Sequence, residues 1–320
     1  MSTQDAGARP IVALTGGTGF IGRRLPQLFT AAGWRVRLLL RRDPVCAEWR
    51  ELEPQIVAGD MGDAAALTQL VSGVDAVVHV AGVLKAARRR RFFAVTHEGS
   101  RALAEATLRH APAAHFLHLS TIAAREPQLS DYAASKRAGE DAVLELLGNR
   151  VTVVRPPAVY GPGDRETLVF FQLARRKFVP LLGAAEARLA MIHADDLASL
   201  IVAQLQATPC GAVLTAADAR PAGYGWHEVL TAFARAVGND RASLFQVPAA
   251  LLHTAALAGD VGKLFGSANM LSSQKLRELR HRDWSVAPAQ WARPAGWEPR
   301  YSLVAGAAHA VAWYQRARWL

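Results

Sequence analysis

Short hydrophobic runs alternate with longer amphipathic segments over the first 155 residues of the chain. Six runs are nearly continuous in apolar residues, as in strands covered on both faces of a parallel sheet: Ile11–Leu14, Val36–Leu40, Gln55–Ala58, Val74–Val78, His115–Leu119 and Val151–Val154. The segments between them place apolar residues at helical spacing: Ile21–Ala32, Ala64–Val71, Phe92–His110 and Tyr132–Leu147. This alternation predicts an α/β fold with a doubly wound parallel sheet of the Rossmann type.

The alternation ends after Val154, where two loop-forming segments follow, Arg155-Pro156-Pro157 and Gly161-Pro162-Gly163. The chain then reads as a helix around 196–206, a short strand at 212–215 and a tryptophan-rich, mostly helical remainder. We predict a dinucleotide-binding domain over residues 1–155, which the chain rejoins near 193–217. A smaller, discontinuous and mainly helical substrate-binding lobe is predicted over residues 156–192 and 218–320.

Composition is that of a globular chain, with 51% hydrophobic and 20% charged residues. The two cysteines, Cys46 and Cys210, lie far apart, and the polar first residues lack the apolar segment of a secretory signal. These features are typical of a reduced, cytoplasmic protein, and we expect that localisation.

The charge of the chain adds little to these predictions of fold and localisation. The net charge of +10 comes mainly from arginine, but no nucleic-acid-binding motif accompanies it, so no nucleic-acid partner is predicted. The run Arg88-Arg89-Arg90-Arg91 follows the fourth hydrophobic run, and we interpret it as a solvated surface, with attraction of an anionic substrate group as the alternative.

One uncharged stretch, 242–259, is long enough to raise the question of a membrane. It contains Gln246, Pro248 and His253, so it is too polar and too broken to span a bilayer. We predict a core helix there, and peripheral contact with a membrane surface is the alternative.

A glycine-rich turn, Thr15-Gly16-Gly17-Thr18-Gly19-Phe20-Ile21-Gly22, joins the first run to the first helical segment. A turn that follows a buried strand and opens a helix is typical of a phosphate-binding loop. Gly16 permits a tight turn, Gly19 lets a pyrophosphate approach the backbone, and Gly22 lets helix and strand pack closely. Free N–H groups at the helix start then face the phosphates. We predict a nicotinamide dinucleotide held by Gly16, Thr18, Gly19, Phe20, Ile21 and Gly22.

The end of the second run indicates which dinucleotide is bound. Arg41 stands where an acidic residue would bind a ribose 2′-hydroxyl, and an arginine there suits a 2′-phosphate instead. NADP(H) is therefore favoured, with Arg42 and Arg23 as neighbours, and NAD(H) remains open because Asp43 can reach the ribose. After the third run, Asp60 is placed to bind the adenine amine, with Met61 beside it.

Tyr132 and Lys136 are four residues apart at the start of a predicted helix, so both side chains lie on one face. A phenol has a pKa of about 10, and lowering it to about 7 requires on the order of 4 kcal/mol. A lysine ammonium about 4 Å away supplies about that much. Thr121, at the end of the fifth run, is predicted to hold the substrate oxygen, with Ser120 as support. The alternative is that one of these hydroxyls caps the following turn.

With these residues the chain resembles the extended or atypical short-chain dehydrogenases/reductases, the NAD-dependent epimerase/dehydratase family. The resemblance is also carried by His79-Val80-Ala81-Gly82, by residues 155–164 and by residues 192–198. It implies that Ala81 and Gly82 line the ribose and nicotinamide, that Lys136 also contacts the cofactor, and that Pro156 to Ala158 border the carboxamide. It further implies structural roles for His79 and His193.

The same resemblance implies a homodimer through a four-helix bundle. The helices that begin near Phe92 and Tyr132 carry small residues suited to close packing between subunits: Ala102, Ala104, Ala106, Ala133, Ala134 and Ala138.

Two positions depart from the family pattern. Thr96 stands where an asparagine is frequent, and Ile122 and Ala123 stand where dehydratases carry an acidic pair, which disfavours sugar-nucleotide dehydration. We expect an NADP-dependent oxidoreductase that interconverts a carbonyl and an alcohol on an apolar or anionic small molecule, with Tyr132 as acid/base. The alternatives are an epimerase that retains its cofactor and acts on a nucleotide sugar, and a non-catalytic cofactor-binding subunit. No metal ligands are predicted.

Overall fold

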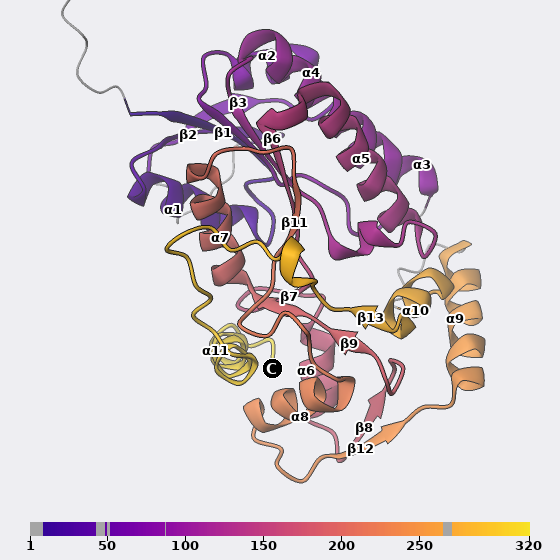
Figure 1. Ribbon diagram of the computed structural model, residues 1–320. Helices are drawn as coiled ribbons and strands as arrows, with labels where there is room; N and C mark the ends of the chain where they lie inside the picture. The colour runs from indigo at the N-terminus through magenta and orange to yellow at the C-terminus, as the bar shows by residue number, and fades with distance from the viewer. Residues whose placement is uncertain (1–8, 43–48, 50–51, 87, 265–270) are drawn as a thin grey trace, which may run out of the picture.

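A computed structural model of the chain describes residues 9–42, 49, 52–86, 88–264 and 271–320. Its centre is a parallel sheet formed by seven strands: β1 (Ile11–Thr15), β2 (Arg35–Leu40), β3 (Gln55–Ala58), β4 (Ala76–His79), β5 (His115–Leu119), β6 (Val151–Arg155) and β11 (Val213–Thr215). Their order is β11-β6-β5-β4-β1-β2-β3, and the sheet lies in the upper part of Figure 1. The prediction of a Rossmann-type α/β fold is confirmed.

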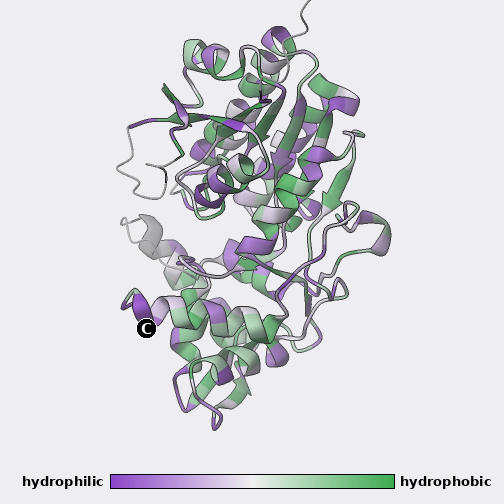
Figure 2. Cartoon of the chain, turned by 90° about the vertical axis from the view of Figure 1, so that its left-hand side faces the viewer, coloured by the Kyte–Doolittle hydropathy of each residue, from purple (hydrophilic) through white to green (hydrophobic). Residues whose placement is uncertain are grey.

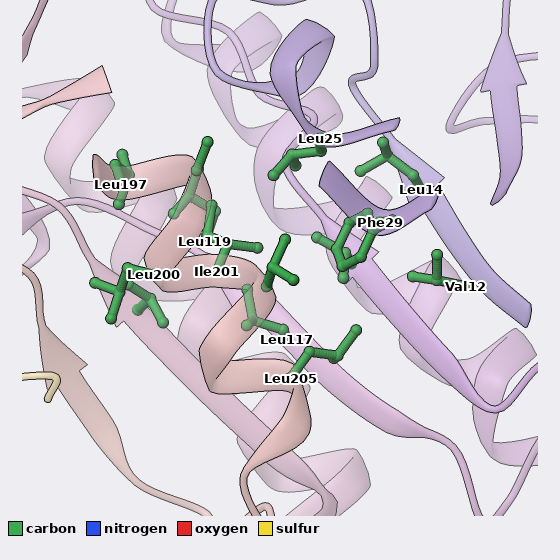
Figure 3. Packing of buried hydrophobic residues seen from close by; sticks show 14 of the residues in the cluster. Val12, Leu14, Leu25, Phe29, Leu117, Leu119, Leu197, Leu200, Ile201 and Leu205 are labelled. Atoms are coloured by element: carbon green, nitrogen blue, oxygen red, sulfur yellow. The ribbon is translucent and has the colours of Figure 1, made fainter. Parts of the chain in front are cut away.

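Helices cover both faces of this sheet (Figure 1). One face is covered by α1 (Leu25–Ala31) and α7 (Ala194–Gln206), and the other by α2 (Ala64–Val71), α4 (Gly99–His110) and α5 (Asp131–Leu147). Figure 3 shows Leu197, Leu200 and Ile201 of α7 packed toward the strands. Because both faces are buried, the strands are apolar at successive positions, which is the pattern seen in the sequence.

The helical segment predicted from Phe92 to His110 consists of three pieces. A short helix, α3 (Arg89–Phe92), continues into a π-helical turn, η3 (Phe93–Glu98), and only then into α4. The wider turn faces α5 closely, because a Cβ added at Gly139 would lie 3.1 Å from the carbonyl oxygen of Thr96. Such turns are rare and occur frequently beside functional sites.

The smaller lobe contains three short parallel ribbons and five helices among its described residues (Figure 2). The ribbons are β7 (Ala158–Tyr160) with β10 (Met191–His193), β8 (Phe178–Leu181) with β12 (Ser243–Gln246), and β9 (Arg188–Leu189) with β13 (Asp283–Trp284). The helices are α6 (Leu168–Ala174), α8 (Trp226–Ala236), α9 (Ala249–Leu264), α10 (Ser273–Arg280) and α11 (Leu303–Arg316). Phe171 and Phe233 stack at 4.0 Å in its core.

The prediction of a core helix within residues 242–259 is wrong. Helix α9 does form there, but it buries only a narrow stripe, in which Leu252 and Ala256 pack against Leu276 of α10. Leu251 and Leu257 on its outer side are 63% and 60% exposed. Among the described residues, no helix is both long and apolar enough to cross a membrane.

Part of the argument for a homodimer also changes. Ala104, Ala106 and Ala133 are buried inside the protomer, against its own sheet and helices, so they are not available to a second subunit. The homodimer itself stays a prediction.

Candidate active site

The glycine-rich turn lies against the loop that follows β4. Gly16 has a φ of +73°, and a Cβ on it would lie 2.6 Å from the backbone nitrogen of Ala81. A Cβ on Gly22 would lie 2.0 Å from the carbonyl oxygen of Gly16. Both positions therefore require glycine. At the tip, Thr18 and Gly19 are exposed, and a Cβ on Gly19 would meet only the Gly16 oxygen within 4 Å, so the outer side of the turn is open to a ligand.

The turn is tied to the smaller lobe by Arg24, which the sequence analysis did not identify. Its guanidinium donates to the carbonyl oxygens of Phe20 and Pro162, at 2.5 and 2.6 Å, and pairs with Asp195 at 2.7 Å. Ile21 packs against the core under the sheet. These contacts hold the phosphate-binding turn in a set position relative to the lobe.

The predicted ribose and adenine residues lie at neighbouring strand ends. Arg41 is exposed directly after β2, and the backbone nitrogen of Gly59 donates to the Leu40 oxygen at 3.0 Å, so Arg41 and Asp60 share one edge. Asp60 is exposed and accepts a hydrogen bond from the Gly62 backbone at 2.8 Å. Met61 packs beside Gly99. Asp43 lies outside the described residues.

Arg23 contacts the smaller lobe. Its guanidinium donates to the carbonyl oxygen of Pro162 at 3.4 Å and lies against Gly163. The expectation that Arg23 lies near Arg41 stays a prediction.

Thr121, Tyr132 and Lys136 come together at the carboxyl end of the sheet. The Thr121 side chain lies close enough to the Tyr132 phenol to lower its pKa. The Thr121 oxygen accepts from the backbone nitrogen of Ala123 at 3.3 Å, so it also caps the following turn. The Lys136 ammonium donates to the Leu119 oxygen at 2.8 Å, and a Cβ on Gly82 would lie 3.4 Å from it.

The electrostatics of this group differ from the expectation. Burial raises the pKa of Tyr132, the hydrogen bond from Thr121 opposes this, and Glu278 raises the pKa further. Burial also lowers the pKa of Lys136 to about 8, and Glu140 opposes that shift. The expectation that Lys136 brings the phenol close to neutrality is not met in this structure, because burial dominates at Tyr132.

Two acidic residues of the site were missed by the sequence analysis. Glu140 lies one helical turn beyond Lys136 and forms a buried two-point ion pair with Arg155, at 2.8 and 2.5 Å. Its spacing from Lys136 along the helix was the signal that could have identified it. Glu278, on α10, accepts a hydrogen bond from Ser130, directly before the Tyr132 helix. Nothing local in the sequence indicates that contact.

The remaining predicted residues line the same edge of the sheet. Pro156 is buried, and its carbonyl oxygen accepts from the Ile122 backbone at 2.8 Å, which joins the loops after β5 and β6. Ala158 is exposed at the start of β7, and Ala81 is half-buried beside Gly16. Ser120 is buried, and its hydroxyl has no hydrogen-bond partner among the described residues.

A row of buried polar side chains lies directly under this edge, on three adjacent strands. The Thr15 hydroxyl lies 2.7 Å from Nδ1 of His79, whose Nε2 lies 2.9 Å from the Ser100 hydroxyl. Burial lowers the pKa of His79 to about 3, so it is neutral and structural at physiological pH. The adjacent His118 is fully buried, and neither ring nitrogen has a hydrogen-bond partner among the described residues.

One group of described residues has the spacing of metal ligands: His193, Asp195 and His309. Nε2 of His193 lies 3.3 Å from Nδ1 of His309, while Nδ1 of His193 accepts from the Asp195 backbone. Because Asp195 is already paired with Arg24, we assign these three side chains to the contact between α1, α7 and α11.

Comparison with known proteins covers both parts of the chain. Residues 12–215 match the family model of the NAD dependent epimerase/dehydratase family. Ceramide reductase of Caulobacter vibrioides is 43% identical over 314 residues, which are 98% of this chain and 97% of that protein. Sterol demethylase protein B of Methylococcus capsulatus is 29% identical over 52% of this chain and 59% of that protein. The NAD-bound structure of the dTDP-glucose 4,6-dehydratase DesIV from Streptomyces venezuelae covers 96% of this chain and 98% of its own, with a TM-score of 0.71 and 24% identity.

Proposed function

The chain belongs to the NAD-dependent epimerase/dehydratase family, and from that premise we propose that it reduces a ketone on a long-chain, ceramide-like lipid to an alcohol. The family and the reductase relative support an NAD(P)-dependent oxidoreductase in general. The direction of the reaction, reduction of a ketone, and the lipid substrate are our proposal. The observation that carries it is the grouping of Thr121, Tyr132 and the buried ammonium of Lys136 at the carboxyl end of the sheet.

The substrate class follows from the relative and from the walls around Tyr132. The similarity to a ceramide reductase extends through the smaller lobe, which is the predicted substrate-binding part. Tyr132 is half-buried and packs against an apolar cluster that includes Ile122, Trp226 and Trp284. An amide carbonyl is stabilised by resonance. A hydride acceptor on such a lipid is therefore a ketone and not the amide.

The described residues fit a nicotinamide dinucleotide. The open outer side of the Gly16 to Gly22 turn would hold the pyrophosphate, and Arg41 and Asp60 would hold the adenosine part. Gly82, Lys136 and Pro156 would border the nicotinamide half. When bound, the reduced cofactor supplies the hydride.

The protein's own side chains handle the oxygen and its proton. The hydroxyls of Thr121 and Tyr132 would bind the substrate carbonyl oxygen from one side. A raised pKa keeps Tyr132 protonated at neutral pH, so it can deliver its proton to the oxygen as negative charge develops there. The Lys136 ammonium then stabilises the phenolate that remains.

The test uses purified protein with NADPH or NADH and a ceramide analogue that carries a ketone on its long-chain base. We expect oxidation of the cofactor in step with formation of the alcohol, detected by absorbance at the nicotinamide band and by mass spectrometry. An inverted stereocentre without net oxidation of the cofactor would indicate an epimerase. Cofactor binding with no turnover on a panel of lipid ketones would contradict the proposal.

A further inference from the structure

We propose that the side of the molecule formed by α3, α10 and α9 docks on an anionic lipid bilayer and delivers the lipid to Tyr132, an inference that rests on the proposed lipid substrate. We call this side the docking face. It comprises the exposed residues Arg88, Arg90 and Arg91 at α3, Lys275 and Arg277 on α10, and Leu251 and Leu257 on α9. Figure 1 shows the three helices along one side of the molecule.

Printed contacts hold these three helices together around the start of α5. Asp131 pairs with Arg89 of α3 at 2.6 Å and accepts from the side chain of Gln274 of α10 at 2.9 Å. Helix α10 in turn packs on α9 through Leu276, and the backbone of Ser273 donates to Asp260 of α9 at 3.2 Å. The three helices of the docking face are therefore linked by contacts and not only aligned in one view.

The proposed proton donor lies close to this face. Tyr132 follows Asp131 directly, and the ring of Phe92 in α3 lies 6.4 Å from the Tyr132 ring. Glu278 of α10 is close enough to raise the pKa of Tyr132. A lipid held by a bilayer at the docking face would thus lie near Tyr132.

The chemistry of the face matches an anionic bilayer surface. From Ala249 to Gly259, α9 has no charged residue, and Leu251 and Leu257 project from its outer side. Exposed basic residues lie on α10, which packs against α9, and on α3, which is linked to α10 through Asp131. Apolar side chains that enter the headgroup region, flanked by arginine and lysine, are typical of helices that lie on membranes.

Vesicle sedimentation tests the face without any substrate. We expect the protein to sediment with vesicles of phosphatidylglycerol and phosphatidylcholine. Binding to vesicles of pure phosphatidylcholine should be weaker by about tenfold or more. Higher salt should weaken binding to the anionic vesicles, because surface charges are screened. The double substitution Leu251→Glu/Leu257→Glu should abolish sedimentation, and Arg90→Gln/Arg91→Gln should reduce affinity by about tenfold.

The matched control is Val304→Glu, because Val304 is 62% exposed and belongs to α11, which Figure 1 shows on the side of the molecule opposite α9. It should sediment like the unchanged protein. Circular dichroism and the thermal midpoint establish that each variant is folded. If the leucine substitutions perturb α9, the single substitution Leu257→Gln is the second test, with an expected loss of affinity of several-fold.

Three results would overturn the docking face. The first is that the unchanged protein does not sediment with vesicles, and the second is that the leucine substitutions do not alter its sedimentation. The third is a fall in molar mass of the leucine variants by light scattering, which would assign α9 to contact with a second copy of the chain. Turnover of a short, water-soluble ketone separates this proposal from the proposed function. The docking-face variants should retain that turnover. If the proposed function is wrong, the unchanged protein should bind vesicles but show no turnover of the ketone.

Discussion

The ammonium of Lys136 donates a hydrogen bond to the carbonyl oxygen of Leu119, 2.8 Å away, and so places a buried cation under the turn that carries Tyr132. Burial disfavours the charged form and brings the pKa of Lys136 down to about 8. The cation is therefore close to losing its proton within the ordinary range of assay pH.

We expect kcat/KM to fall as the pH rises through about 8, because Lys136 then loses the charge that stabilises the Tyr132 phenolate. Glu140 raises the pKa of Lys136, so Glu140→Gln should move this alkaline limb to lower pH. The measurement is a pH profile of initial rates at low substrate. A limb that does not move in the variant would mean that another group titrates.

Tyr132→Phe should lower turnover by about a hundredfold to ten-thousandfold, because the phenol is the proposed proton donor. Cofactor binding should stay nearly intact, since the ring and the hydroxyl of Thr121 remain. Lys136→Ala should weaken both turnover and cofactor binding. Rates and fluorescence titration with NADPH distinguish the two variants. Retention of more than a few per cent of turnover in Tyr132→Phe would show that the proton comes from elsewhere.

Arg41 should determine cofactor preference. A hydrogen bond to a charged group contributes about 1.5–3 kcal/mol, so one or two contacts to a 2′-phosphate favour NADPH over NADH by roughly tenfold to several hundredfold. Arg41→Ala should remove most of that preference by weakening NADPH, with little effect on NADH. Titration with both reduced cofactors measures it. Equal affinities in the unchanged protein would mean that Arg41 stays in solvent.

Acid should destabilise the protein through its buried histidines. The pKa of His79 is lowered to about 3, so between pH 6.5 and 3 its imidazole is protonated in the unfolded chain but not in the folded chain. The free energy of unfolding should therefore fall, as pH falls through that window, by about 1.4 kcal/mol per pH unit for His79 alone. Urea unfolding at pH 7, 6 and 5 measures this slope. A flat profile would show that His79 is charged in the fold.

His79 and His118 should respond differently to removal of the imidazole. His79→Leu loses hydrogen bonds to Thr15 and Ser100 and should cost about 2–3 kcal/mol in the free energy of unfolding. His118 has no partner among the described residues, so His118→Leu should leave stability at pH 7 unchanged or raised. Denaturant unfolding of both variants provides the comparison. A large loss in His118→Leu would reveal a bound partner, such as an internal water.

The local spacing of residues was enough to predict part of the fold and of the candidate site from the sequence alone. Runs such as Ile11–Leu14 predict buried parallel strands because successive apolar side chains need cover on both faces. Gly16 and Gly22 are identifiable because only glycine tolerates the contacts of the turn. Tyr132 and Lys136 share a face because a helix repeats about every 3.6 residues. Most of these properties are set by neighbours within a few positions along the chain, although Gly16 also meets the backbone of Ala81.

Burial and long-range contact had to come from the tertiary structure. The pKa of Tyr132 is raised instead of lowered mainly because the fold buries the phenol, and Glu278, which arrives from α10, raises it further. Arg24 pairs with Asp195 and donates to Pro162, because the lobe lies against the start of α1. The apolar stretch of α9 is exposed because only Leu252 and Ala256 find partners in α10. Desolvation and Coulomb interactions depend on which distant segments meet, and no local pattern in the sequence specifies that.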